Sequence, residues 1–213
     1  MDEQVLAALA RWPNVPAAYG WLSLSRRGQW LLHPHGQAWG VPDEEPGEPI
    51  TNPQILAFIK RNYQSDDQGR WFFQNGPQRV YVRLDGAPWI LRTSSDTSTA
   101  LALLTHTDQP YGPIIRWWLD DGGHLYAQSD QGAGLITDRD LIQVIDALRT
   151  DDGQTLSAWL EDNDPPQALD AARLSIRLGD SCPAAPLGRL RAGTAASVLG
   201  FVHRPTAPSP GDA

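Results

Sequence analysis

Two stretches of the chain have apolar residues at the spacing of a helix that buries one face. The first covers residues 53–63 and the second residues 139–148, and in each the apolar positions recur three and four residues apart. This spacing predicts two amphipathic helices, each packed through its apolar side. Asn52 can cap the first helix, with Pro53 at the position where a missing N–H costs nothing, and Asp138 can cap the second.

Strand-like patterns lie on both sides of each predicted helix. Apolar runs around Trp21 and Trp30 enclose the polar turn Ser25–Gly28, and Asp120–Gly123 separates a similar pair of runs. Turns of this kind need positive φ angles, so both indicate β-hairpins. From Arg79 to Leu84 every second residue is apolar, which predicts a strand with one buried face. The apolar set is Val80, Val82 and Leu84, and the opposite set is Arg79, Tyr81 and Arg83.

The two halves of the chain resemble each other. Residues 50–59 align with residues 136–145 at an offset of 86, and residues 79–84 align with residues 173–178 at an offset of 94. Recurrence of this kind indicates an internal duplication, although short apolar words also recur by chance. We therefore expect an α+β fold of two related modules, each an antiparallel sheet with one packed helix.

The expected segments follow from this alignment and from the composition of the ends. They are an N-terminal segment 1–17, module one 18–113, a degenerate module two 114–204 and a disordered tail 205–213.

Composition narrows the classes of function. The net charge of −8 argues against broad nucleic-acid or membrane-surface binding, because both need a basic surface. We find no apolar run of membrane-spanning length and no secretion signal at the start. The single cysteine, Cys182, excludes an internal disulfide and is typical of a reducing compartment. We therefore expect a cytoplasmic protein without a membrane partner.

The alternating strand from Arg79 to Leu84 carries the chemistry of most interest. Guanidinium groups bind carboxylates and phosphates through paired N–H donors, so a strand face with two arginines suits an anionic ligand. Nearby tryptophans could line its pocket or instead fill the core, and the arginines could instead pair with local carboxylates. The residues expected to bind the ligand are Trp71, Asn75, Arg79, Tyr81, Arg83, Trp89 and Arg92.

Signals for catalysis and for metal binding are weak. The chain lacks the phosphate-binding loop, the dinucleotide fingerprint and the serine-hydrolase motif. His106, which His203 matches in the second half, is a candidate acid or base, although a strand-end histidine more often bonds to the backbone. His33 and His35 have no further ligands beside them, so no metal site is expected. The cofactor, if any, is unknown.

Several words of the sequence are distinctive. They are ARWPNVP, YGWL, ITNP, FIKRNY and GRWFFQNGPQRVYV, which begin at Ala10, Tyr19, Ile50, Phe58 and Gly69. Together they resemble a proteobacterial family of unknown function, over roughly residues 10–140. The plan of hairpin, helix and repeated strands is also similar to a second uncharacterised bacterial family, whose fold of repeated motifs has been linked to signalling. Neither resemblance implies an activity, a cofactor or a catalytic residue.

The sequence supports three hypotheses about function. The first is a non-catalytic binding or regulatory protein that holds an anionic small molecule or a protein partner. The second is an enzyme with its site in the cleft between the modules. The third is a structural subunit or homo-oligomer, in which exposed Trp89 or Trp118 packs on another chain.

Overall fold

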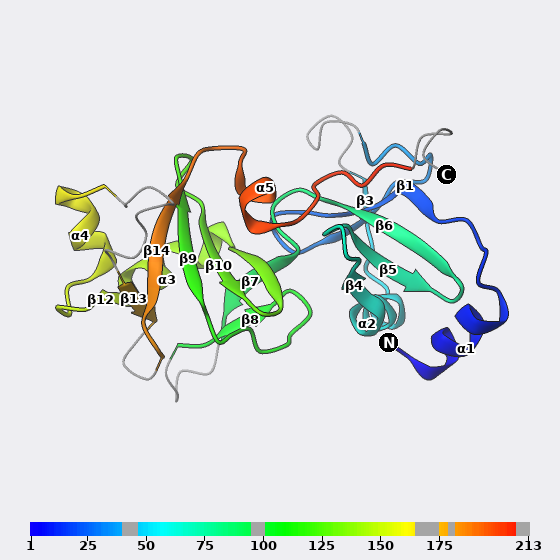
Figure 1. Cartoon of the computed structure of the whole chain (residues 1–213), viewed down its shortest axis with the longest axis horizontal. Coiled ribbons are helices and arrows are strands. Elements are labelled where there is room, and N and C mark those ends of the chain that lie inside the picture. Colours follow the sequence, from blue (N-terminus) through cyan, green and yellow to red (C-terminus); the bar gives the residue numbers. More distant parts are fainter. Residues whose placement is uncertain (40–46, 95–100, 165–174, 179–181, 208–213) are drawn as a thin grey trace. The chain divides into compact units, whose positions relative to one another are not determined.

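The computed structural model (Figure 1) describes residues 1–39, 47–94, 101–164, 175–178 and 182–207. The first two residues of the aligned range 173–178 and the predicted tail from residue 208 lie outside these ranges. The chain forms two compact units, which we call unit 1 (Met1–Gly86 and Phe201–Ala213) and unit 2 (Ala87–Gly200). The division at residue 86 differs from the expected module boundary at residue 113, because the strands after residue 86 pair with the second sheet.

Unit 1 is built on a six-stranded sheet with the order β3-β2-β1-β6-β5-β4. Its elements are α1 (Glu3–Arg11), β1 (Ala18–Leu24), β2 (Trp30–Leu32), β3 (Glu48–Pro49), α2 (Pro53–Asn62), β4 (Tyr63–Ser65), β5 (Trp71–Asn75) and β6 (Gln78–Leu84). Neighbouring strands are antiparallel except for β1 and β6, which run parallel. The sheet is therefore mixed and not purely antiparallel as expected, because its sixth strand closes against its first.

Turn and cap residues place these elements as the sequence predicts. The β1–β2 turn has Gly28 at φ 77° and the β5–β6 turn has Gly76 at φ 56°, angles that favour glycine. The side chain of Asn52 accepts hydrogen bonds from the N–H groups of Gln54 and Ile55, and Pro53 is the first residue of α2. The prediction for the start of this helix is confirmed.

The two faces of the unit 1 sheet have different cover. Helix α2 packs on one face, where Phe58 meets Phe73 edge to face with ring centroids 5.6 Å apart and Ile59 is buried. On the opposite face Tyr19 stacks on Tyr81 at 4.7 Å. We call these the helix face and the outer face.

The C-terminal segment returns to unit 1. The N–H of Leu84 donates to the carbonyl of His203, and the N–H of Val202 donates to the carbonyl of Gly69. His203 Nδ1 lies 2.7 Å from the Leu84 carbonyl oxygen. These bonds explain why residues from Phe201 onward belong to the first unit.

Unit 2 is built on an eight-stranded sheet with the order β12-β13-β14-β9-β10-β11-β7-β8. Its elements are β7 (Trp89–Thr93), β8 (Leu103–Thr105), β9 (Arg116–Asp120), β10 (Leu125–Ser129), β11 (Gly132–Ile136), α3 (Asp138–Ala147), β12 (Leu148–Thr150), α4 (Leu156–Asp162), β13 (Ser175–Leu178), β14 (Ala185–Leu190) and α5 (Ala195–Leu199). Two strand pairs, β9–β14 and β7–β11, are parallel, so this sheet is mixed as well.

Six strands of unit 2 have the same order as the six strands of unit 1. From β11 to β12 the order is third, second, first, sixth, fifth and fourth in sequence, as it is from β3 to β4. In both units the first and sixth strands are parallel, and a helix connects the third strand to the fourth. Unit 2 adds β7 and β8 beside β11, and it adds α4 between β12 and β13.

This order corrects two details of the sequence alignment. By position in the sheet, the counterpart of β6 is β14, whereas the aligned words place residues 79–84 opposite β13. The cap of α3 is Thr137, which makes no side-chain cap bond, and Asp138 is the first helical residue. The helices thus begin 85 positions apart, because two residues lie between Ile50 and α2 whereas one lies between the aligned Ile136 and α3.

Each unit has its own hydrophobic interior. In unit 2 one cluster joins the sheet, α3 and α4, and includes the fully buried Trp117, Val144 and Leu156. In the part of the chain that the structure describes, no helix has the length and apolar character needed to cross a bilayer.

Candidate functional site

The predicted arginine strand is β6, but from Tyr81 onward both of its faces are buried and not one face as expected. Arg83 has only 1% of its surface exposed. Its Nε donates to Asp85 Oδ1 at 2.7 Å, and its Nη1 donates to the carbonyl of Ala38. The guanidinium therefore joins the segment that follows β2 to the outer face, and its charge is balanced by Asp85.

Further polar contacts hold this segment on the outer face. Ser23 Oγ and His33 Nε2 lie 2.9 Å apart, and both residues are buried. A Cβ on Gly20, whose φ is 83°, would lie 2.3 Å from the carbonyl oxygen of Gly36, so only glycine allows this approach. His33 is thus part of the packing, and no group of three or more metal-ligating side chains occurs among the described residues.

Arg79 and Tyr81 form a second group at the far end of the same face. The exposed guanidinium of Arg79 lies 4.6 Å from the centre of the Phe72 ring, and that of Arg70 lies 4.8 Å from the Tyr81 ring. The Tyr81 hydroxyl donates to Asp66 at 3.0 Å. Burial raises the pKa of Asp66, but hydrogen bonds from Arg70, from Tyr81 and from the backbone outweigh it, and the pKa is lowered overall.

The other predicted ligand residues lie elsewhere. Trp71 is buried on the helix face, with its ring 4.8 Å from that of Tyr63, and Asn75 is exposed at the end of β5. Trp89 and Arg92 belong to unit 2. The Trp89 indole N–H donates to the Gln131 carbonyl at 2.7 Å.

Arg92 pairs with the carboxylate of Asp108. The structure thus brings Arg79 and Tyr81 together on the outer face of unit 1. Of the other predicted residues, Arg83 is buried on the same face and Trp71 and Asn75 belong to β5. Trp89 and Arg92 belong to unit 2.

His106, the candidate acid or base, has a half-buried ring whose Nε2 is enclosed. Its Nδ1 accepts a hydrogen bond from the N–H of Ile90 at 3.3 Å, and its ring lies 5.7 Å from that of Trp89. Burial lowers the pKa of His106 to about 3, against a smaller opposing effect of the Asp108 charge. The imidazole is therefore neutral at pH 7, and it has the backbone bond of a strand-end histidine.

A groove of about 560 Å³ lies between α2 and the helix face of unit 1. Trp21, Leu32 and Ile55 border it with 45%, 41% and 47% of their surface exposed. The groove is lined by Trp21, Leu22, Leu32, Ile50, Gln54, Ile55, Phe58, Ile59, Phe73, Asn75 and Val80. The described residues of this lining include two amides and no charged side chain, so the groove suits an apolar surface.

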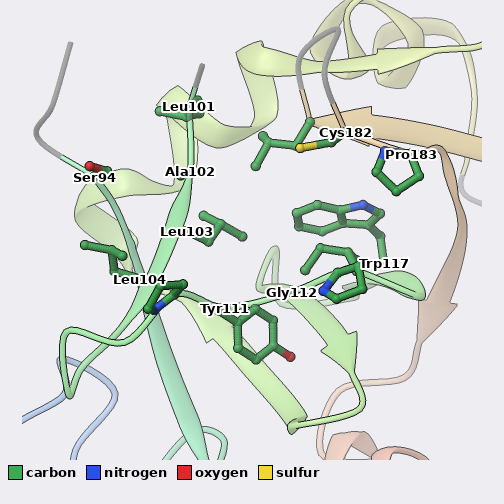
Figure 2. A pocket seen from close by; sticks show the side chains of 14 residues that line it. Ser94, Leu101, Ala102, Leu103, Leu104, Tyr111, Gly112, Trp117, Cys182 and Pro183 are labelled. Atoms are coloured by element: carbon green, nitrogen blue, oxygen red, sulfur yellow. The ribbon is translucent and has the colours of Figure 1, made fainter. Parts of the chain in front are cut away.

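Unit 2 contains a smaller pocket of about 310 Å³ beside β8 and β9 (Figure 2). Figure 2 shows the indole of Trp117 among the side chains of Leu103, Cys182 and Pro183. Tyr111 also lines the pocket, but its hydroxyl turns away and lies 2.8 Å from the carbonyl oxygen of Ala127. Burial raises the pKa of Tyr111, so its hydroxyl stays protonated.

Neither the groove nor the pocket is evident from the motifs in the sequence. Trp21 and Leu32 stand in apolar runs that a strand pattern assigns to the core. The signal that bears on them is the number of tryptophans, nine in 213 residues, which predicts that some remain partly exposed.

Known proteins were compared with this chain by sequence and by structure. The comparison with curated proteins gives no match. A solved structure of a DUF1285 family protein from Silicibacter pomeroyi DSS-3 has a TM-score of 0.49 and 16% identity, and the match covers 88% of this chain and 96% of that one. A second DUF1285 family protein, from Shewanella baltica OS155, has a TM-score of 0.40 and 12% identity, over 58% of this chain and 89% of that one. The profile of a family described as a protein of unknown function (DUF2946) matches residues 1–206, and the chain therefore belongs to this family, DUF2944.

Proposed function

We propose that this is a non-catalytic binding protein, and that the groove of unit 1 receives an apolar helix of a protein partner. The observation that carries the proposal is the group formed by Trp21, Leu32 and Ile55, which border a groove of about 560 Å³ while 41–47% exposed. Contiguous exposed apolar surface of this kind is typical of interaction sites. A partner helix would bury these side chains as a core does.

The corresponding helix of unit 2 supports this choice of partner. Helix α3 contacts β7 and α4, and α4 contributes Leu156, Trp159 and Leu160 to the hydrophobic cluster. In unit 1 the link from β4 to β5 is the short turn Asp66–Gly69, so no helix follows β4. The chain itself thus covers α3 with a helix, and a helix from another protein would cover α2.

The edge of the unit 1 sheet argues against a partner that adds a strand. β3 is the edge strand next to the groove, and it consists of Glu48 and Pro49. Proline has no N–H to donate and is a residue that protects sheet edges from pairing. An incoming strand would find few backbone partners there, whereas a helix needs only the side-chain groove.

Two further ideas from the sequence analysis are also proposed, one about the origin of the fold and one about a different ligand. We infer that the two units arose by internal duplication, which the shared strand order and the paired words around Ile50 and Ile136 support. An anionic ligand remains a second candidate, because the exposed guanidinium of Arg79 lies over Phe72 and guanidinium groups bind anions through paired N–H donors. An Arg79→Ala variant that binds phosphates unchanged in a thermal-shift assay would remove that candidate.

The groove is tested by site-specific photocrosslinking in the native cell. A photoreactive amino acid replaces Gln54, which lines the groove, and the crosslinked peptides are identified by mass spectrometry. We expect one apolar, helix-forming segment, lost in an Ile55→Glu variant and retained in Ile142→Glu. Ile142 is the matched control, because it is 73% exposed on α3.

The other outcomes contradict the proposal. A crosslink that Ile55→Glu does not change would place the contact outside the groove. A crosslink to a second copy of this chain would show a homo-oligomer in place of a different partner. A crosslink to an extended, non-helical segment would contradict the helix.

A further inference from the structure

We propose a second site that is independent of the groove: the pocket of unit 2 binds a neutral apolar compound of two or three fused rings. The pocket is formed by side chains that the fold already holds in place. Trp117, Leu103 and Tyr111 are 1%, 4% and 7% exposed, and Leu178 is 4% exposed. A ligand would therefore enter a site that is largely preformed.

The volume sets the size of the ligand. An apolar cavity of about 150 Å³ holds one benzene molecule. The pocket of about 310 Å³ is roughly twice as large, so it has room for a fused ring system. This volume lies at the lower end of the range for small-molecule pockets, about 300–1,000 Å³, which argues against larger cofactors.

The lining sets the charge of the ligand. Among the described residues that line the pocket, none has a charged side chain, and the polar side chains are those of Ser94, Tyr111 and Cys182. The Tyr111 hydroxyl is already bonded to the backbone. A charged ligand would lose its hydration without gaining a partner, whereas a neutral one would lose little.

The indole of Trp117 sets the shape of the ligand. Its ring lies near Leu103 (Figure 2), and the aliphatic side chain of Ile114 also lines the pocket. Aromatic rings pair with an indole in offset or edge-to-face arrangements, a gain that a branched aliphatic compound of the same volume lacks. We therefore expect planar aromatic compounds to bind better than aliphatic ones.

The single cysteine provides a reporter inside the site. Cys182 lines the pocket and is half-buried, and as the chain has one cysteine, a thiol reagent modifies this position alone. A bound ring compound would shield the sulfur. The rate of Cys182 alkylation therefore measures occupancy without knowledge of the natural ligand.

The experiment measures Cys182 alkylation and melting temperature of the full chain with increasing naphthalene, indole and 2-naphthoate. We expect naphthalene and indole to slow alkylation and to raise the melting temperature in a saturable way. The anion 2-naphthoate is expected to bind about tenfold or more weakly. No saturable effect of naphthalene or indole, or equal binding of 2-naphthoate, would overturn the proposal.

Two neighbouring isoleucines give a matched pair of variants. Ile114 lines the pocket, whereas Ile115 is 55% exposed. Ile114→Trp fills the pocket and is expected to abolish the protection of Cys182, and Ile115→Trp is expected to leave it unchanged. If Ile114→Trp does not fold, Leu104→Trp fills the same pocket from β8. Protection that survives a folded pocket-filling variant would contradict the site.

Discussion

The helices α2 and α3 connect the third strand to the fourth in sheets of the same strand order, yet their surroundings differ. Around α3 the chain adds β7 and α4, and Asp140 accepts a hydrogen bond from the Thr93 N–H at 3.0 Å. The chain has no counterpart of α4 after α2; Asp2, just before α1, pairs with Arg61 near the end of α2, and Ile55 stays 47% exposed beside a groove. Hydrogen bonds between the strand backbones maintain the strand order whatever packs on the sheet. Whether a helix leaves an exposed binding surface therefore depends on the elements added around the sheet.

An arginine near the end of β6 and another near the end of its counterpart β14 also have different surroundings in the two units. Arg83 in β6 and Arg189 in β14 are both the residue before the last of their strands. Arg83 is covered by the segment that follows β2 and pairs with Asp85, whereas Arg189 is 35% exposed and pairs with Asp121. The two arginines therefore differ in burial, although both stand one residue before the end of their strands.

The largest expected effect tests this pair of arginines. Arg83→Ala leaves Asp85 and the Ala38 carbonyl buried without their donor, so it is expected to lower the free energy of unfolding by about 3–5 kcal/mol. Arg189→Ala is expected to have a small effect, because its ion pair is exposed to solvent. Urea denaturation of both variants measures the difference, and equal losses would contradict the distinction.

The second largest expected effect compares how well α3 and α2 are covered by other parts of the chain. Leu156 in α4 is fully buried in the hydrophobic cluster, so Leu156→Ala is expected to lower the free energy of unfolding by about 2–5 kcal/mol. Ile55→Ala in α2 removes a side chain that is 47% exposed, and we expect a loss below about 1 kcal/mol. A larger loss for Ile55→Ala would mean that the groove is closed in solution.

A third prediction concerns pH and unit 2. The pKa of His106 is lowered from 6.5 to about 3 by burial, so between these values the unfolded state binds more protons than the folded state. The stabilisation is complete above pH 6.5 and is lost as the pH falls towards 3, with a slope of at most about 1.4 kcal/mol per pH unit. His106→Asn is expected to flatten this slope of the free energy of unfolding.

The control for the pH experiment is His35→Asn, since His35 is exposed in unit 1. Denaturation curves at intervals from pH 3 to 7 compare the two variants with the parent protein. An unchanged slope in His106→Asn would show that the ring nitrogens reach solvent.

The smallest effect compares the two helix caps. Asn52 accepts two backbone hydrogen bonds, so Asn52→Ala is expected to destabilise the protein by about 1 kcal/mol. Thr137 makes no side-chain cap bond, and Thr137→Ala is expected to cost less than Asn52→Ala. Thermal denaturation of both variants decides the order, and a larger cost for Thr137→Ala would contradict it.

Much of the fold could be predicted because local patterns decide it. The apolar spacing of residues 53–62 and the polar turn at Gly28 suffice for a helix and a hairpin. The α+β class and the relation to a family of unknown function are confirmed. The residue-by-residue alignment of the two halves is harder to predict. One extra residue before a helix leaves the apolar spacing within the helix unchanged, but it shifts every pair of aligned residues by one position.

The candidate sites could not be predicted in the same way. Alternation correctly places Arg79 and Arg83 on one face, but only the segment that crosses that face makes one exposed and the other buried. The groove depends on strands β1, β2, β5 and β6 meeting α2, and the pocket joins Leu103 to Leu178 across the sheet. Such contacts join residues far apart in the chain, and the periodic spacing of apolar residues does not predict them.

The sequence by itself determined the helices, the turns and the alternating faces of the strands, because these depend on backbone angles and on the spacing of apolar residues. Only the tertiary structure decided which of those faces is covered. Burial is a property of the neighbours that a face meets, and the neighbours of α2 and α3 differ although the helices hold the same place in their sheets.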